Sequence, residues 1–532
     1  MNNQVDLVLT SANWRSTPDG MIHFWTSIRT DSPIPVEQLR QGDYSQIPDN
    51  WTAVLLSSAG ATLVSDRVRS HALLYGWSGE SWIITDSPDH LQSSLETWAI
   101  NTEQAALFPH LGFSVGPDTL IAGVRTVQAG SSVDLDTDSS EDRISFYGAH
   151  RFSHERHEDE AEYSELFTSM LDETIGRVIE QAAGRQLAIP LSGGIDSRLL
   201  LLWLKRLGAP NVIAFTYGVP QSTEAAVSSR TAALLETPWF MIETDPLAIR
   251  NAWFSHEADA FMSATWAGTS LPHVQDWYAL RKIRENSLLE EDAIILPGHT
   301  IVGNLHDENL LDETPGKDQV NDALRRHHGS HSSPRRGFVS SVPFREAIDS
   351  AFEEAGFDDS TASLHASIEW FNLRERQAKY INNSMRGYEF FGWDWAIPMA
   401  TADAFEAWSR GGQVFTTTRD WYQRFTDREF AAVTGSDVSY FTAPSAPVPP
   451  KLKRVLLKIM RSLRLDRVLS QLRSTRSMLN HPMGFDGFIR DRNRLRVGLR
   501  MLGGQTTISL WANDFLHNKW GSSECAIVPP MR

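Results

Sequence analysis

Cysteine is almost absent from this chain of 532 residues, in which Cys525 stands alone. A single cysteine excludes a disulfide framework, a CxxC redox pair and a cysteine-rich zinc site. Long apolar runs are missing as well, because no segment approaches the ~20 residues needed to span a bilayer. The opening sequence MNNQVDLVLTSANW has neither the charged start nor the apolar core of a signal peptide. We therefore expect a soluble, cytoplasmic protein.

An excess of basic residues is also lacking, since the formal net charge is −17 and the pI is near 5.5. An acidic chain repels the phosphates of nucleic acid, so we expect no nucleic-acid partner. The bulk composition is ordinary for a globular protein, with 41% hydrophobic and 22% charged residues. The length exceeds what one compact core usually organises, which predicts two domains.

The N-terminal part contains short apolar segments separated by turn residues. Four examples are WTAVLLSS from Trp51, ATLVSD from Ala61, ALLYGW from Ala72 and SWIITDS from Ser81. Turns at such regular intervals predict antiparallel sheet. A helix should follow, because apolar residues recur at helical spacing from Leu166 to Val178 before a stop at Gly184. We place the first domain at residues 1–150 and the second at residues 160–532.

From Gln186 onward the pattern changes to strand, loop, helix and strand. The segments are QLAIPLSGGIDS, RLLLLWLKRLG and NVIAFTYG. Such a βαβ unit predicts a parallel sheet with a right-handed crossover, and further strands are expected at WFMIET and AIILPGHT. Two stretches should be irregular: a polar surface loop over Glu313–Ser340 and a Pro-rich connector over Ala443–Pro450.

The strongest chemical signal lies in the loop between that first strand and helix. The loop reads Leu191-Ser192-Gly193-Gly194-Ile195-Asp196-Ser197. Its two glycines let backbone N–H groups close around a phosphate, its two serine hydroxyls add donors, and the helix directs its positive end at the anion. Asp196 offers a hard oxygen ligand for a magnesium ion that bridges phosphates. The alternative is a Gly-Gly turn that merely joins strand to helix, and the complete motif in this context disfavours it.

This loop is not a Walker A loop, because GxxxxGK[ST] does not occur in the chain. SGGxDS resembles the pyrophosphate loop of the N-type ATP pyrophosphatases, which cleave ATP between its α and β phosphates. The resemblance implies that ATP is bound by Leu191, Ser192, Gly193, Gly194, Asp196 and Ser197, with Asp196 also holding Mg2+. Family members that transfer sulfur are typically basic and use paired cysteines. This chain is acidic and has one cysteine, so we expect a nitrogen nucleophile rather than a sulfur nucleophile.

Further segments resemble the asparagine synthetase family, over roughly Gln186 to Asp403. AFTYG followed by Glu224 is similar to the family's adenine-side strand and helix. LPHVQDW, LPGHT and RERQAKYINNSMRGYEFFGWDWAIPMATAD are similar to a subgroup often encoded with surface-polysaccharide genes, and LVSDRVRSHALLY and GPDTLIAGVRTVQAG resemble the glutaminase-like domain. The resemblance implies an α/β synthetase domain with a parallel sheet, of the adenine nucleotide α-hydrolase type. A degenerate, Ntn-type, glutaminase-like α+β sandwich would precede it.

One departure from the family concerns the glutaminase site. A glutamine amidotransferase of this kind needs cysteine as its first mature residue, because the free α-amine acts as base for the thiolate. Here Met1 is followed by Asn2 and Asn3, and the NGE glutamine-binding signature is missing. We therefore predict no glutaminase activity. Ammonia would be free or delivered by a separate supplier, unless the nucleophile is an amine of the substrate, as in β-lactam synthetases and lasso-peptide cyclases.

A second departure lies in the loop Pro297–Val302. The family's Ser-Gly-Glu-Gly-x-Asp pattern puts its second magnesium-binding aspartate on Val302, which cannot bind metal. Either Asp307 or Glu308 substitutes for it, or Asp196 and the phosphates hold the ion alone.

Two neighbouring residues of the same loop receive roles from the resemblance. Gly298 joins the ATP-binding set. His299 falls where the family has glutamate, and it is a candidate base for taking a proton from the attacking nitrogen, since an unperturbed histidine has a pKa of ~6.5. The alternative is a histidine that only hydrogen-bonds a backbone turn.

Weaker signals come from basic residues. Synthetases of this type use a late lysine to stabilise charge on the α-phosphate, and Lys453 is our candidate by position, with Lys451 beside it and a solvated helix face as the alternative. The basic, amphipathic segment that starts there could contact an anionic membrane surface, although packing on its own protein is the favoured interpretation. Arg374, Glu375, Arg376 and Lys379 either line the acceptor side or form a solvated helix surface.

The resemblance implies a reaction in two steps. A carboxylate and MgATP give an acyl-adenylate and pyrophosphate, and nitrogen attack then forms an amide and releases AMP. The carboxylate would be aspartate, the family's usual substrate, or a uronic or other sugar acid, as the polysaccharide-type segments indicate. Two alternatives stay open: an intramolecular amide-forming cyclase, and a nucleotide-binding pseudoenzyme, which the valine at position 302 favours.

Overall fold

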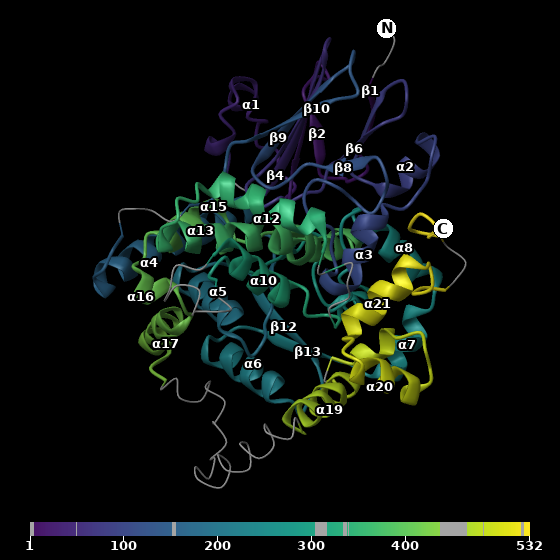
Figure 1. Cartoon of the computed structure of the whole chain (residues 1–532). Coiled ribbons are helices and arrows are strands. Elements are labelled where there is room, and N and C mark those ends of the chain that lie inside the picture. The colour runs from purple at the N-terminus through teal and green to yellow at the C-terminus, as the bar shows by residue number, and fades with distance from the viewer. Residues whose placement is uncertain are drawn as a thin grey trace.

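The computed structural model describes residues 5–48, 50–151, 156–303, 316–333, 338, 340–436, 465–481, 483–522 and 526–531. The two N-terminal sheets lie at one end of the molecule and a parallel sheet lies at the other, with helices between them (Figure 1). No helix within these described ranges is both long and apolar enough to cross a bilayer.

Two facing sheets form the N-terminal part. The six-stranded antiparallel sheet has the order β10-β9-β5-β4-β3-β2, with bounds Asp142–Phe146, Ser131–Asp136, Gly60–Ser65, Trp51–Ser57, Ile22–Thr26 and Trp14–Ser16. The second sheet has the order β1-β7-β6-β8, with bounds Val5–Val8, Trp82–Thr85, Leu74–Trp77 and Val124–Thr126. All four segments expected from Trp51 to Ser81 are strands. Pairing is antiparallel except between β1 and β7, which run parallel.

The sheets pack face to face through alternating apolar side chains. Val54, Leu63 and Val133 of the large sheet meet Tyr75 and Ile84 of the small one in a single buried cluster. Helices cover the outer faces: α1 (Val36–Gln41) on the large sheet, and α2 (Pro88–Ser94) on the small one, near α3 (Thr102–Leu111). The expected α+β sandwich is therefore present, while its kinship to Ntn-type glutaminases stays a prediction.

The second sheet system is fully parallel, as the βαβ pattern predicts. Its order is β13-β12-β11-β14-β15, with bounds Trp239–Glu243, Val212–Gly218, Leu187–Pro190, Ile294–Ile295 and Asp394–Trp395. The chain starts in the middle strand, winds outward in one direction to β13, and then returns to β14 on the other side. The order of strands thus reverses between β11 and β14. Open sheets of this kind bind ligands beyond the carboxyl ends of the strands at such a point.

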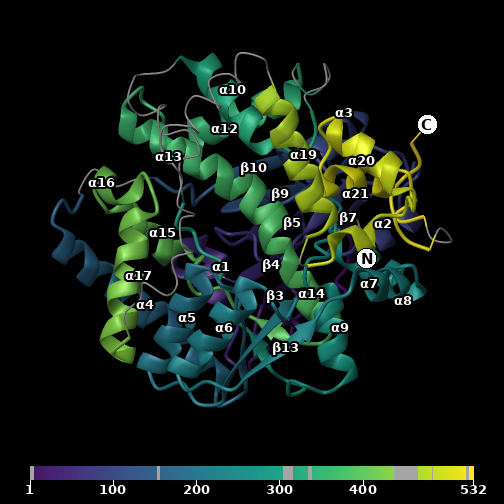
Figure 2. The same cartoon turned by 90° about the horizontal axis from the view of Figure 1, so that it is seen from below.

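Helices surround the parallel sheet and fill the C-terminal part. Those from Glu160 to Glu285 are α4 (Glu160–Ala182), α5 (Ile195–Arg206), α6 (Thr223–Leu234), α7 (Pro246–Trp253), α8 (His256–Thr265) and α9 (Trp277–Glu285). Later helices are α10 (Lys317–His328), α12 (Val342–Ala355), α13 (Thr361–Phe371), α14 (Met385–Phe390), α15 (Ala402–Ser409), α16 (Gln413–Thr416), α17 (Asp420–Thr434), α19 (Leu465–Leu479), α20 (Arg494–Leu502) and α21 (Thr507–Leu516). Seen from below, α4 and α17 lie beside α5, and α6 lies next to α5 (Figure 2).

One expectation about loops is wrong. The stretch Glu313–Ser340 contains α10, although its composition indicated an irregular surface loop. The helix forms because Val320, Ala323 and Leu324 recur at helical spacing and are buried. Its start is fixed by Gln319, whose side-chain Oε1 accepts the backbone N–H of Gly316 at 3.1 Å. The Pro-rich connector Ala443–Pro450 lies outside the described residues.

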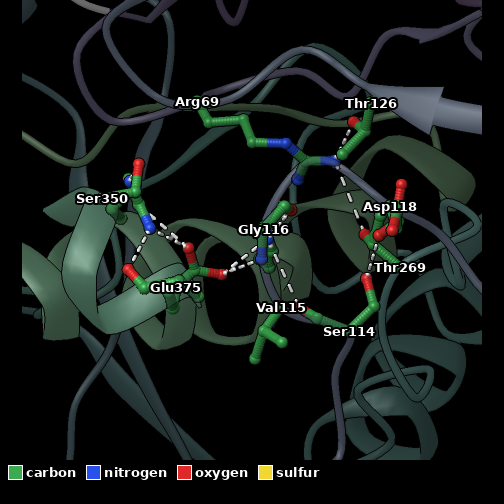
Figure 3. A network of polar contacts seen from close by, with 12 residues as sticks. Arg69, Ser114, Val115, Gly116, Asp118, Thr126, Thr269, Ser350 and Glu375 are labelled. Atoms are coloured by element: carbon green, nitrogen blue, oxygen red, sulfur yellow. Dashed lines mark hydrogen bonds and ion pairs between the residues drawn. The ribbon is translucent and has the colours of Figure 1, made fainter. Parts of the chain in front are cut away.

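The interpretation of the charged run after Phe371 as a solvated surface is also wrong. Residues Asn372–Ile381 form a π-helix between α13 and α14, and Arg374, Glu375 and Lys379 are fully buried in it. Glu375 accepts from Arg374 Nε at 2.9 Å, from Lys379 Nζ at 2.6 Å and from the backbone N–H of Gly116 at 3.0 Å. Figure 3 shows how this carboxylate reaches the loop of the N-terminal part that carries Ser114 and Gly116.

Every donor nitrogen of these two buried cations is used. Arg374 also donates to Ser350 at 3.0 Å, to the Ala347 carbonyl at 2.6 Å and to the Glu354 carboxylate. Lys379 also donates to the carbonyls of Ser114 and Gly116. Buried charges persist only when their hydrogen-bonding capacity is met in this way. The network therefore joins the N-terminal loop to the helical layer as a structural element.

Candidate functional site

The Leu191–Ser197 loop and the Pro297–Val302 loop meet where the strand order of the parallel sheet reverses. The first follows β11 and the second follows β14. A Cβ atom on Gly298 would lie 2.5 Å from the backbone nitrogen of Ser197 and 2.7 Å from its Cα, so no side chain fits there. This close approach explains the glycine and brings two of the predicted ATP-binding residues into contact.

Hydrogen bonds within the first loop set its shape. The backbone N–H of Ser192 donates to Ser197 Oγ at 3.1 Å, and the Ser192 and Ser197 hydroxyls are also 3.1 Å apart. Ser192 Oγ in turn accepts the backbone N–H of Gly194 at 3.1 Å. The serines thus shape the turn, a role that the motif alone did not indicate.

The same loop leaves the start of α5 open. Gly194 is the N-cap of this helix and is solvent-exposed, and no side chain caps the first turn. The first N–H groups of a helix carry partial positive charge and need acceptors. An anion such as a phosphate can supply them.

Two hydroxyl groups that sequence reasoning missed anchor the loop from outside. The carbonyl oxygen of Leu191 accepts from Thr216 Oγ1 at 2.7 Å and from Ser228 Oγ at 3.0 Å. Trp239 Nε1 donates to Thr216 Oγ1 at 2.9 Å. These residues come from β12, α6 and β13, so the neighbouring strands and helix hold the loop in place. Leu191 therefore fixes the loop through its carbonyl, and its side chain is buried.

Asp196, the predicted magnesium ligand, is paired with an arginine. Its Oδ1 accepts from the Arg419 guanidinium, and the two side chains are 25% and 35% exposed. Burial raises the pKa of the Asp196 carboxyl, and the positive charge of Arg419 opposes that rise. Arg419 directly precedes α17, and its guanidinium lies 5.2 Å from the ring centre of Tyr422.

Two further polar groups lie beside this pair. Arg419 Nε is buried and has no hydrogen-bond partner. The Tyr422 hydroxyl faces Asp196 and Thr300, and burial together with the Asp196 charge raises its pKa well above the usual range. Neither residue was singled out from sequence, because they lie more than two hundred positions from the loop and no local pattern links them.

Two ion pairs hold α17 alongside α5. Arg198 Nη1 lies 3.3 Å from Asp427 Oδ1, and Arg206 Nη1 lies 3.0 Å from Glu429 Oε2. The two helices consequently lie side by side, as Figure 2 shows. This arrangement places Arg419 at the mouth of the phosphate loop.

His299, the candidate base, adjoins the loop through Gly298. Its backbone N–H donates to the Pro297 carbonyl at 2.8 Å, and its side-chain Nδ1 is buried without a partner. Burial, together with the nearby His273, lowers the pKa of His299 to about 4. The imidazole is therefore neutral at neutral pH, able to accept a proton but weak as a base.

Val302, at the position of the family's second metal ligand, is buried. The adjoining Gly303 packs on Glu369 of α13, whose carboxylate oxygens lie 2.4 Å from where a Cβ on Gly303 would stand. Burial raises the pKa of Glu369 to about 7. The substitutes considered for Val302, Asp307 and Glu308, lie outside the described residues, as do the lysines Lys451 and Lys453.

Asp196 alone offers a metal ligand in this loop. Within the described ranges, no group of three or more His, Cys, Asp or Glu side chains could hold a metal ion. Mg2+ commonly keeps one or two carboxylates and takes its other ligands from phosphates and water. The residues present fit a magnesium ion that is held mainly by phosphates, provided that Arg419 moves off the carboxylate.

Comparison with known proteins agrees with this geometry. A model of the asparagine synthase family matches residues 169–286, which span the phosphate loop and the strands β11 to β13. No curated protein matches the chain.

Two solved structures are similar to parts of the chain. The NH3-dependent NAD synthetase from Campylobacter jejuni, in complex with nitrate, is 17% identical over 36% of this chain and 83% of its own, with a TM-score of 0.20. NMN synthetase from Francisella tularensis is 14% identical over 42% of this chain and 97% of its own, with a TM-score of 0.19. With TM-scores this low, neither structure supports an inference about the fold or function of this chain. At the coarse level that the family model supports, the chain contains an asparagine synthase-like, ATP-using ligase segment built on a parallel α/β sheet.

Proposed function

We propose that this protein adenylates a carboxylate, either aspartate or a uronic or other sugar acid, and converts it to an amide with ammonia. In the first step a carboxylate oxygen attacks the α-phosphorus of ATP, and the bond to the β-phosphate oxygen breaks, releasing pyrophosphate. In the second step ammonia attacks the acyl carbon, loses a proton to a base, and AMP leaves with the bonding electrons.

One observation carries this proposal. The SGGIDS turn lies at the carboxyl end of β11, beside the point where the strand order reverses, and the first turn of α5 has no side-chain cap. Backbone N–H groups at a helix start bind phosphate. The match of residues 169–286, which include this loop, to the asparagine synthase model also supports the proposal.

The proposal gives each residue a task. The loop N–H groups hold the pyrophosphate portion, and Thr216 and Ser228 keep the loop rigid through Leu191. Asp196 would hold Mg2+, which neutralises phosphate charge when it is bound. His299, neutral because its pKa is about 4, is the candidate acceptor for the nitrogen proton. Lys453 stays a candidate for stabilising charge on the α-phosphate.

Exchange of labelled pyrophosphate into ATP tests the first step. The protein is incubated with Mg2+, ATP and a panel of carboxylates that includes aspartate and uronic acids. We expect exchange that depends on one class of carboxylate. Mass spectrometry of the product with and without ammonium then tests the second step, because amidation needs ammonium whereas an intramolecular cyclase does not.

A second candidate function is nucleotide binding without turnover. The ion pair between Arg419 and the predicted magnesium ligand, together with the buried Val302, favours it. Binding of ATP with no exchange for any carboxylate in the panel would select this candidate over the ligase.

A further inference from the structure

Arg419 has no counterpart in the sequence motif, yet it contacts the central carboxylate of the loop. We propose that Arg419 is a phosphate-binding residue, which leaves Asp196 when a nucleotide or pyrophosphate enters the loop and donates to its phosphate oxygens. The inference rests on the proposed function only in taking the loop to bind phosphate.

The first argument is an unused donor of Arg419. Arg419 uses Nη2 on Asp196 but leaves Nε buried without a partner. A buried donor that lacks an acceptor costs free energy. An oxyanion that enters the phosphate loop can accept from this donor.

The second argument is the chemistry of guanidinium. Its planar array of donors matches a phosphate in two-point contact, and its charge persists at any physiological pH. The side chain is 35% exposed, so incoming ligand can reach it. Stacking over Tyr422 and the attachment of α17 to α5 limit how far it can move.

The third argument is competition for one carboxylate. While Arg419 is bound to Asp196, it blocks that oxygen from a metal ion. Movement of Arg419 to phosphate frees Asp196, so phosphate and Mg2+ should each strengthen binding of the other, because coupling between two sites is reciprocal. Mg2+ also binds phosphates directly, so the part of this coupling that depends on Arg419 is the part that Arg419→Gln should remove.

The experiment is calorimetric titration of pyrophosphate, and separately of ATP, with and without Mg2+. The wild-type protein is compared with Arg419→Gln, Arg419→Lys and the control Arg428→Gln. Arg428 is a matched control, because it lies on α17, the helix that Arg419 directly precedes, 5.4 Å from the Phe425 ring, and pairs with Glu429 at 3.3 Å. Thermal unfolding of each variant reports whether the fold is kept.

We expect Arg419→Gln to weaken pyrophosphate binding at least about tenfold, since a charge-assisted hydrogen bond is lost. Arg419→Lys should fall between this variant and the wild type, and Arg428→Gln should bind as the wild type does. Asp196→Asn gives a second measure: without Mg2+ it should bind pyrophosphate more tightly than the wild type, because Arg419 is released and a repelling charge is gone.

Three results separate this inference from the proposed function. Unchanged pyrophosphate affinity in Arg419→Gln, with a lowered melting temperature, would reduce Arg419 to a structural ion pair and overturn the inference alone. Failure of the wild type to bind either ligand overturns both proposals. Loss of affinity in Arg419→Gln, combined with no carboxylate-dependent exchange by the wild type, supports the inference and removes the ligase function.

Discussion

Two carboxylates of this molecule, Glu375 and Asp196, each face an arginine, and their surroundings differ. Glu375 lies fully buried in a network in which every donor nitrogen of Arg374 and Lys379 has an acceptor. Asp196 is partly exposed, and its partner Arg419 keeps an unused buried N–H group.

The difference separates a structural charge from a functional one. A closed network, in which every donor is paired, has no free donor for a ligand. Removing one member leaves the other charges uncompensated in a low-dielectric interior. A cluster with an unpaired buried donor is less stable than a fully paired one, and a ligand that accepts from this donor removes the difference. Glu375 should therefore affect folding, whereas Asp196 should affect binding.

The largest effect that this comparison predicts is on folding. Glu375→Ala should lower the free energy of unfolding by about 3–5 kcal/mol, because Arg374 and Lys379 are left buried without their carboxylate. Chemical denaturation measures the change. Arg143→Ala, which breaks an exposed pair with Asp134, is the control and should have little effect. A Glu375→Ala protein as stable as the control would show that the closed network is not structural.

Glu369 sharpens the comparison, since it is buried like Glu375 but has few partners. Among the described ion pairs its only one is with His365, at 4.0 Å. Burial raises its pKa from 4.5 to about 7. Between these values Glu369 keeps a proton in the folded chain that it releases in the unfolded chain, so its own contribution to stability falls as pH rises through this window, by roughly 3 kcal/mol in total.

Denaturation at pH 5 and pH 8 tests this pH dependence. Glu369→Gln should lack the contribution of Glu369 to this pH dependence, and so should be more stable relative to the wild type at pH 8 than at pH 5, because its amide does not ionise. Glu353→Gln, on the exposed side of α12, is the matched control and should keep the wild-type difference. Equal pH dependence in the wild type and Glu369→Gln would contradict the assignment.

A smaller effect is expected where the two loops touch. Gly298→Ala places a Cβ against the Ser197 backbone and should destabilise the protein by about 1–3 kcal/mol, while weakening ATP binding. Denaturation and calorimetric titration with MgATP measure the two changes. Gly176→Ala in α4 is the control, because a Cβ there meets nothing within 4 Å. If Gly298→Ala matched that control in both measurements, the loop contact would be irrelevant to binding.

Local patterns in the sequence predicted much of this fold. The strands from Trp51 to Thr85 and the βαβ unit around the phosphate loop follow from period-two and helical spacing over a few residues. The position of the loop at the edge of a parallel sheet then follows from the way such units assemble. These features depend on neighbours in the chain.

What sequence reasoning missed depends on residues far apart. The charges of the π-helix are buried because Glu375 and Lys379 meet a loop about 260 positions earlier, which no local pattern reveals. Arg419 reaches Asp196 from 223 positions away. The ATP-binding roles of the loop residues, the base role of His299 and the role of Lys453 stay predictions.

The account depends most on the space inside the Leu191–Ser197 turn. Gly194 has an extended backbone that other residues can adopt, and a Cβ there would point at Ser192 Oγ, 3.1 Å away. Gly194→Val should therefore fill the turn without unfolding the protein. Calorimetric titration with MgATP should show binding to the wild type and its loss in Gly194→Val at an unchanged melting temperature. Equal binding by both proteins, or none by the wild type, would contradict the phosphate-binding role of this turn.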